Sequence, residues 1–163
     1  MKRYLQVFLL AVAFDLYWTL VVLFREKGLI IWLALALALL ACLLLPSVYR
    51  FYAIGLAAAG SLLDTLWALT GLIAFAGESL MPLWMVALWL MFATVWTQLT
   101  RTTTLPGWLL TLLAAVGGPV AYLIGERLDA ITFLEPTFIV VSWMAPGWLV
   151  LMLFFHLLMG RQK

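Results

Sequence analysis

Six long runs of apolar residues, separated by short polar segments, constrain this chain more than any other feature of its sequence. The runs cover residues 4–24, 29–45, 51–75, 82–100, 106–125 and 136–159. About 20 residues of α-helix cross the hydrocarbon core of a bilayer, and most of these runs have about that length. Only 10% of the 163 residues are charged, whereas a soluble domain carries about a quarter. The runs therefore predict membrane-spanning segments.

Backbone chemistry predicts that these segments are helices. In hydrocarbon every N–H and C=O must be paired within the protein, and a helix pairs them inside one segment. A transmembrane β-barrel would show short segments of alternating apolar and polar residues, which this sequence lacks. We predict an all-α integral membrane protein, a single domain over residues 1–163, folded as a compact bundle of six transmembrane helices. Pro46 is expected to end the second helix, Gly117-Gly118-Pro119 to interrupt the fifth, and Pro146 to bend the sixth.

Positive charges between the runs predict the orientation. With six spans both termini lie on one side, which holds six cations: Lys2, Arg3, Arg50, Arg101, Arg161 and Lys163. The other side holds three: Arg25, Lys27 and Arg127. Because Lys and Arg are enriched in cytoplasmic loops, both termini are expected in the cytoplasm. Ala11-Val12-Ala13 resembles the cleavage site of a secretory signal peptide. The apolar run continues to Phe24, however, so we expect an uncleaved first membrane-spanning helix.

The contents of cysteine, histidine and charge narrow the classes of function. Cys42 and His156 are the only residues of their kinds, so zinc and di-iron sites, which need several such ligands, are not expected. The net charge is +2 and no basic block occurs, so nucleic-acid binding is not expected. We expect no metal and no cofactor, and membrane lipids as the immediate partners.

Two aspartates are the most informative polar residues. Asp15 and Asp64 fall near the middle of the first and third runs, where a charge costs at least about 2.5–3.5 kcal/mol. Each is expected to face other helices, in one shared polar interior. Trp18 shares a helical face with Asp15, and Trp67 shares one with Asp64. Each acid is either a functional group or a hydrogen-bonded link between helices.

Other polar residues within the runs are weaker candidates. Gln98 and Arg101 lie on one face near the end of the fourth run. Arg101 either binds a lipid phosphate or carboxylate, or only marks the membrane surface. Tyr122 follows the Gly117-Gly118-Pro119 step, which either opens a backbone carbonyl to a ligand or allows close helix packing. His156 either relays a proton or anchors the end of the sixth helix.

Three stretches together resemble one known family. They are Ser61-Leu-Leu-Asp64-Thr-Leu-Trp67-Ala-Leu-Thr-Gly71, Pro82-Leu-Trp84 through Phe92-Ala93-Thr94, and Gly117-Gly-Pro-Val-Ala-Tyr122-Leu-Ile-Gly125. The chain is similar in them to the domain-of-unknown-function 2878 family of small bacterial inner-membrane proteins. The family has no assigned reaction, and its genes stand near those of fatty-acid-modifying enzymes. The resemblance thus implies a multi-pass protein of the bacterial cytoplasmic membrane, acting close to acyl lipids.

Three functions follow as hypotheses. In the first, the protein binds or moves a lipid-like substrate, or assists lipid-modifying enzymes as a partner. In the second, it is a small proton-coupled secondary transporter, and in the third a membrane-embedded lipid-modifying enzyme. We expect binding or transport rather than catalysis. The candidate ligand-binding residues are Asp64, Asp15, Trp67, Trp18, Tyr122, Gln98 and Arg101.

Overall fold

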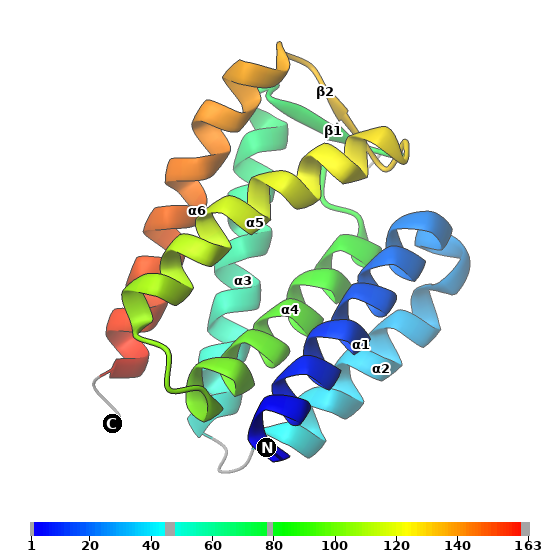
Figure 1. Cartoon of the computed structure of the whole chain (residues 1–163). Helices are drawn as coiled ribbons and strands as arrows, with labels where there is room; N and C mark the ends of the chain where they lie inside the picture. Colours follow the sequence, from blue (N-terminus) through cyan, green and yellow to red (C-terminus); the bar gives the residue numbers. More distant parts are fainter. Residues whose placement is uncertain (1, 45–47, 78–79, 161–163) are drawn as a thin grey trace. The chain divides into compact units, whose positions relative to one another are not determined.

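A computed structural model describes residues 2–44, 48–77 and 80–160. Six α-helices and two short strands form this described part, with a 3-10 turn, η1 (Arg25–Gly28), after the first helix. The elements, labelled in Figure 1, are α1 (Lys2–Phe24), α2 (Leu29–Leu43), α3 (Val48–Leu69), β1 (Ile73–Phe75), α4 (Leu83–Thr102), α5 (Gly107–Arg127), β2 (Ile131–Phe133) and α6 (Thr137–Gly160). They group into two compact units, Met1–Ala58 with Leu83–Thr104, and Ala59–Pro82 with Leu105–Lys163. Each unit is described by itself.

The first unit is built on a helical hairpin. Arg25 has a φ of 47°, a left-handed conformation that an α-helix cannot continue, and the chain reverses through η1 into α2. The Tyr17 hydroxyl of α1 donates to the carbonyl of Trp32 in α2 at 2.8 Å, and the two rings meet edge to face at 6.0 Å. These contacts would be impossible in one straight helix, because 15 residues would separate the two groups by roughly 22 Å.

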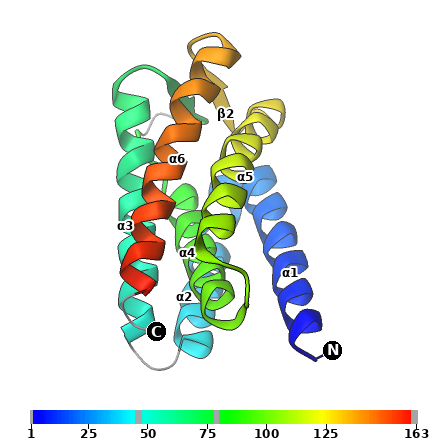
Figure 2. The same ribbon diagram turned by 60° about the vertical axis from the view of Figure 1, so that its left-hand side comes forward.

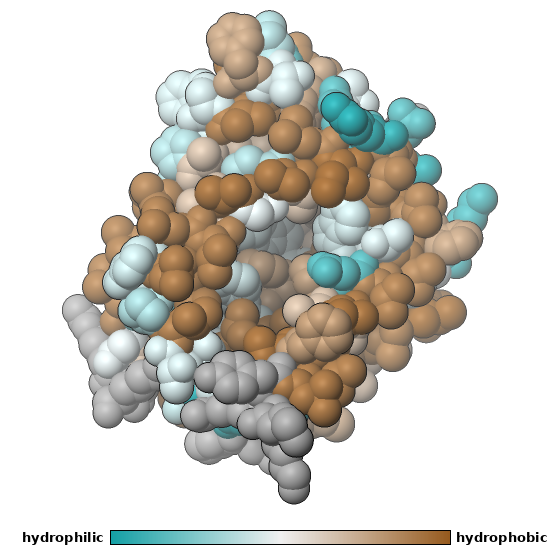
Figure 3. All heavy atoms as spheres, viewed as in Figure 1, coloured by the Kyte–Doolittle hydropathy of each residue, from teal (hydrophilic) through white to brown (hydrophobic). Residues whose placement is uncertain are grey.

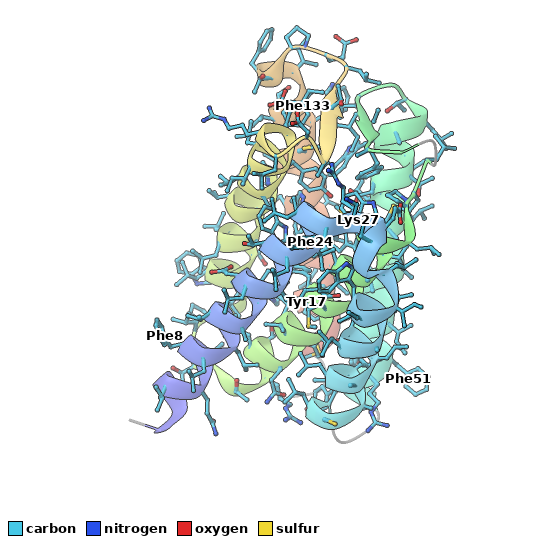
Figure 4. The ribbon with its side chains drawn as sticks, turned by 90° about the vertical axis from the view of Figure 1, so that its right-hand side faces the viewer. Phe8, Tyr17, Phe24, Lys27, Phe51 and Phe133 are labelled. Carbon is cyan, nitrogen blue, oxygen red and sulfur yellow. The ribbon has the colours of Figure 1, made fainter. Side chains whose placement is uncertain are left out.

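Helix α4 packs against both helices of this hairpin. Tyr17 lies on the side of α1 that meets the neighbouring helices, whereas the exposed Phe8 points away (Figure 4). The end of α2 is closed by Arg50 of α3, which donates to the carbonyls of Leu44 at 3.0 Å and Ala41 at 2.7 Å. Terminal carbonyls of a helix lack partners within it, and the guanidinium of Arg50 supplies donors to two of them at the end of α2.

The second unit is centred on the packing of α5 against α6, which lie side by side in Figure 2. Gly118 of α5 sits directly under the indole of Trp148 of α6: a Cβ at residue 118 would lie 2.2 Å from Trp148 Cε2. Such close approach is how small residues join helices in membranes. The expected interruption at Gly117-Gly118-Pro119 is therefore wrong, because α5 continues through Pro119 and the glycine serves close packing.

Helices α3 and α5 end in the same way. The N–H of Leu72 donates to the carbonyl of Trp67, and the N–H of Gly71, with a φ of 74°, to that of Ala68. The corresponding bonds at the end of α5 run from Ala130 to Gly125 and from Asp129, with a φ of 55°, to Glu126. Both are Schellman motifs, which satisfy the last carbonyls of a helix. Each leads straight into a strand.

Strands β1 and β2 form an antiparallel pair with the register Ile73↔Phe133, Ala74↔Thr132 and Phe75↔Ile131. The pair joins the chain after α3 to the chain after α5. Open sheet edges do not occur in contact with hydrocarbon, because their N–H and C=O groups would be unpaired. We therefore expect this end of the second unit to lie near the surface of the membrane.

The predicted helices are confirmed, with corrections to their bounds. The third run does not remain helical to Phe75: the Schellman motif at Gly71 ends α3 at Leu69, and β1 follows. Helix α6 continues through Pro146, and the bend expected there stays a prediction. Pro46, Glu78, Ser79, Arg161 and Lys163 lie outside the described residues. Both strands were missed.

Five helical segments of the described chain are long and apolar enough to cross a membrane: Leu5–Leu43, Val48–Leu69, Leu83–Thr102, Gly107–Arg127 and Thr137–Gly160. The first contains both arms of the α1–α2 hairpin. Apolar residues cover most of the face drawn in Figure 3, as expected for a surface that meets lipid. The six-span topology, the single domain and the cytoplasmic termini stay predictions.

Candidate functional site

The carboxyl group of Asp64 is held inside the second unit by a hydrogen bond from Tyr122. Tyr122 Oη, on α5, donates to Asp64 Oδ1, on α3. Asp64 has no exposed surface, and Tyr122 is 3% exposed. Removing a carboxyl group from water is costly unless the group is hydrogen-bonded. The hydrogen bond from Tyr122 therefore offsets part of the cost of burying Asp64 in the second unit. We call Asp64, Tyr122 and Trp67 the Asp64 cluster.

Trp67 completes this cluster one turn beyond Asp64. Its ring meets the ring of Tyr122 edge to face, with centroids 5.9 Å apart and planes at 89°, a favoured geometry for aromatic pairs. On its other side Trp67 packs against α6, where a Cβ at Gly147 would lie 2.7 Å from Trp67 Cζ2. Glycine at residue 147 therefore allows α6 to press Trp67 toward Tyr122, and three helices hold the cluster.

The depth of Asp64 differs from the prediction. Because α3 ends at Leu69 and not at Phe75, Asp64 lies five residues from the end of its helix, roughly 8 Å along the axis. Tyr122 is likewise five residues from Arg127, the last residue of α5. The cluster thus lies between the middle of each of these two helices and the end that leads to the β1–β2 sheet. Ser61, one turn before Asp64, has a buried Oγ that no described residue hydrogen-bonds.

Asp15 and Trp18 lie on α1, in the first unit. Asp15 is exposed on α1, and Trp18 is partly exposed. The Thr19 hydroxyl donates to the backbone carbonyl of Asp15 at 2.8 Å and not to its carboxylate. Within the first unit, α1 packs through a narrow stripe that includes Tyr17 and Val21. The expectation that Asp15 and Asp64 face one shared polar interior stays a prediction.

Gln98 and Arg101 lie near the end of α4 in the first unit. The Arg101 guanidinium carbon is 5.2 Å from the centroid of the Tyr49 ring, within cation–π range. Thr97, one turn before Arg101, has no exposed surface. Its Oγ1 and the Oε1 of Gln98 are buried and have no hydrogen-bond partner among the described residues. Thr97 was not a predicted site residue, although its place in the sequence next to Gln98 and one turn before Arg101 could have indicated it.

His156 forms a second buried polar pair within the second unit. Its Nδ1 lies 2.7 Å from Thr111 Oγ1, and the same hydroxyl donates to the carbonyl of Gly107 at 2.9 Å. The Thr111 hydroxyl thus lies within hydrogen-bond distance of both a backbone carbonyl of α5 and the imidazole of α6. This pair anchors α6 to the start of α5. No group of three or more potential metal ligands occurs among residues 2–44, 48–77 and 80–160.

Long apolar helices, a helical hairpin and a carboxyl group paired inside a helical unit define a multi-pass α-helical membrane protein. The chain belongs to the DUF2878 family of proteins of unknown function, whose sequence profile it matches over residues 7–154. The predicted family is thereby confirmed. No curated protein and no solved structure matches the chain.

Proposed function

We propose that this protein is a small proton-coupled membrane transporter in which the carboxyl group of Asp64 binds and releases the proton. The observation that supports this proposal is the hydrogen bond from Tyr122 to an Asp64 side chain with no exposed surface. Ionisable residues inside membrane-spanning segments commonly mark proton or substrate paths. The cluster lies about a turn and a half from the end of α3, a short distance for a proton to travel from water.

Coupling requires that protonation and conformation depend on each other. An ionised Asp64 needs the donor that Tyr122 supplies, because a buried charge that loses a hydrogen bond costs several kcal/mol. A protonated Asp64 is neutral and needs it less. Movement of α5 along α3 that separates Tyr122 from Asp64 is therefore linked to proton uptake, and proton release favours their contact. The protein would thus have two states, one with the contact between Tyr122 and Asp64 and one without it. A transporter that opens to one side of the membrane at a time needs two such states.

The test is the accessibility of a cysteine placed beside Asp64. Ser61→Cys is nearly isosteric and keeps Asp64, and Cys42→Ala removes the native thiol. In sealed vesicles a water-soluble thiol reagent should label residue 61 when added to either face, because a transporter site opens to both. Adding Asp64→Asn, which cannot exchange a proton, should lower labelling from one face about tenfold. Val140→Cys, at a residue of α6 with no exposed surface, is the unreactive control.

Labelling from one face alone, unchanged by Asp64→Asn, would contradict transport. Labelling only by a reagent dissolved in the lipid would instead favour a site that opens sideways to the bilayer.

Binding of a lipid-like substrate is the second candidate, and the polar face near the end of α4 favours it. Buried polar atoms in native proteins nearly always have a partner, and an exception calls for an explanation such as a bound polar group. Gln98 Oε1 is such an atom, on a side chain that is only partly buried and within one turn of the partly exposed Arg101. A lipid headgroup supplies both hydroxyl donors and a phosphate for arginine.

Native mass spectrometry of the purified protein tests this candidate. Arg101→Gln should lower the occupancy of bound acidic phospholipid several-fold, because arginine binds phosphate through two parallel hydrogen bonds. Arg127→Gln, at an exposed arginine that ends α5, should leave the occupancy unchanged. Equal lipid occupancy in the two variants would show that Arg101 on α4 does not bind the lipid.

A further inference from the structure

Helix α6 touches the Asp64 cluster through Gly147. A Cβ at Gly147 would lie 2.7 Å from Trp67 Cζ2 and 3.6 Å from Leu63 Cδ2, so the backbone of α6 lies against the turns of α3 that carry Asp64. The ring of Trp67 meets the ring of Tyr122 edge to face, and Tyr122 donates its hydroxyl hydrogen to Asp64. A series of direct contacts thus leads from the backbone of α6 to the hydrogen bond at Asp64.

The next residue of α6 contacts the other helix of the cluster. The indole of Trp148 lies over Gly118 of α5, where an added Cβ would come 2.2 Å from it. Gly118 is four residues before Tyr122 on the same helix, and so one turn away on the same face. Adjacent residues of α6 therefore hold both the helix that carries Asp64 and the helix that carries Tyr122.

Pro146 interrupts the backbone hydrogen bonds of α6 immediately before these two contacts. Proline has no N–H, so the carbonyl of Ser142, four residues earlier, lacks its usual helical donor. Helices bend most readily at such residues. The ends of α3 and α5, by contrast, are joined by the paired strands β1 and β2. A change in α6 at this level would therefore act on the cluster from the side that the sheet does not fix.

We propose that Gly147 and Trp67 are positioning residues of the proton site: the backbone at Gly147 holds the Trp67 ring, and this ring holds the Tyr122 hydroxyl on Asp64. The inference rests on the proposed function and names the element that controls its proton-binding group. Neither positioning residue gives or takes a proton. Because side chains in a close-packed interior transmit small displacements to one another, a shift of α6 at Gly147 changes the hydrogen bond that Asp64 receives.

Infrared difference spectra of the reconstituted full-length protein between acid and alkaline pH test this inference. The C=O band of a protonated Asp64 responds to the hydrogen bond from Tyr122. The Cβ added by Gly147→Ala would displace Trp67, so the band should shift in the same direction as in Tyr122→Phe. Trp67→Phe, which leaves a gap beside Tyr122, should shift it as well. The double variant Gly147→Ala, Trp67→Phe should return the band toward its wild-type position, because the smaller ring makes room for the added methyl group.

Thr111→Val is the matched control for loss of stability alone. Thr111 is eleven residues before Tyr122 on α5, roughly 16 Å along the helix axis. Its hydroxyl lies within hydrogen-bond distance of the Gly107 carbonyl and of His156, far from the Asp64 cluster. The variant should lower the midpoint of unfolding in sodium dodecyl sulfate and leave the band at its wild-type frequency.

The outcomes separate this inference from the proposed function. A band that Tyr122→Phe displaces but Trp67→Phe leaves unmoved would overturn the inference alone, and Trp67→Phe, which adds no atoms, decides the matter even if Gly147→Ala does not fold. A shift in Thr111→Val as large as that in Gly147→Ala would also overturn it, because the band would then report general loosening. A spectrum without any band that depends on Asp64 would overturn the proposed function and this inference together.

Discussion

Gly118→Ala is expected to loosen the packing of α5 on α6 and to destabilise the protein by about 1–3 kcal/mol, the usual cost of overpacking. The added Cβ would lie 2.2, 2.3 and 2.6 Å from three atoms of the Trp148 indole, far inside contact distance. Trp148 is 6% exposed, so its ring has little room to move aside. The helices would have to separate, and the many contacts between them would weaken together.

The adjacent glycine provides a matched control. A Cβ at Gly117 would meet nothing within 4 Å, and alanine is favoured over glycine in a helix by up to about 1 kcal/mol. Gly117→Ala should therefore be neutral or mildly stabilising. Titration of each variant with sodium dodecyl sulfate, followed by tryptophan fluorescence, measures both effects. Equal stability of the two variants would show that Gly118 is not the contact point between α5 and α6.

The helices of this protein follow from its sequence, but the ends of two of them do not. Apolar runs predict spans because each must cross hydrocarbon as a helix. The run after Asp64 continues to Phe75 without a charge, so hydropathy gives no reason to stop at Leu69. The sequence does contain a residue that favours a left-handed turn at each of the two helix ends. These residues are Gly71, before Leu72-Ile73, and Asp129, before Ala130-Ile131. Residues that tolerate left-handed conformations, followed by alternating β-formers, indicate a helix end and a strand.

Local helical spacing predicts one part of the candidate site, and the packing of separate helices determines the rest. Asp64 and Trp67 share a face because they are three residues apart on one helix, and this spacing is visible in the sequence. The contact of Tyr122 with both depends on how α5 packs against α3, which no local pattern determines. The packing of α1 in the first unit depends equally on such contacts: a narrow stripe that includes Tyr17 meets α2 and α4, and the sequence does not show which residues form it.

Tyr122→Phe should cost about 1–3 kcal/mol of stability, a large effect for the loss of one oxygen atom. The substitution keeps the ring that packs against Trp67 and removes only the donor to Asp64. The matched control is Tyr52→Phe, because Tyr52 is a half-buried tyrosine of α3 whose hydroxyl has no hydrogen bond to a described residue. Unfolding in detergent should place Tyr52→Phe at the wild-type midpoint and Tyr122→Phe clearly below it. Equal midpoints would mean that Tyr122 does not stabilise Asp64.

Asp64→Asn separates proton binding from hydrogen bonding. The amide oxygen still accepts from Tyr122, so the variant should remain folded, but it cannot take up a proton. Infrared difference spectra of the reconstituted protein between acid and alkaline pH measure proton binding most directly, because a protonated carboxyl group has its own C=O stretching band. We predict a band that is present in the wild type, absent from Asp64→Asn, and displaced in frequency in Tyr122→Phe. A spectrum in which no band depends on Asp64 at any pH would contradict the proton-binding role on which the proposed transport rests.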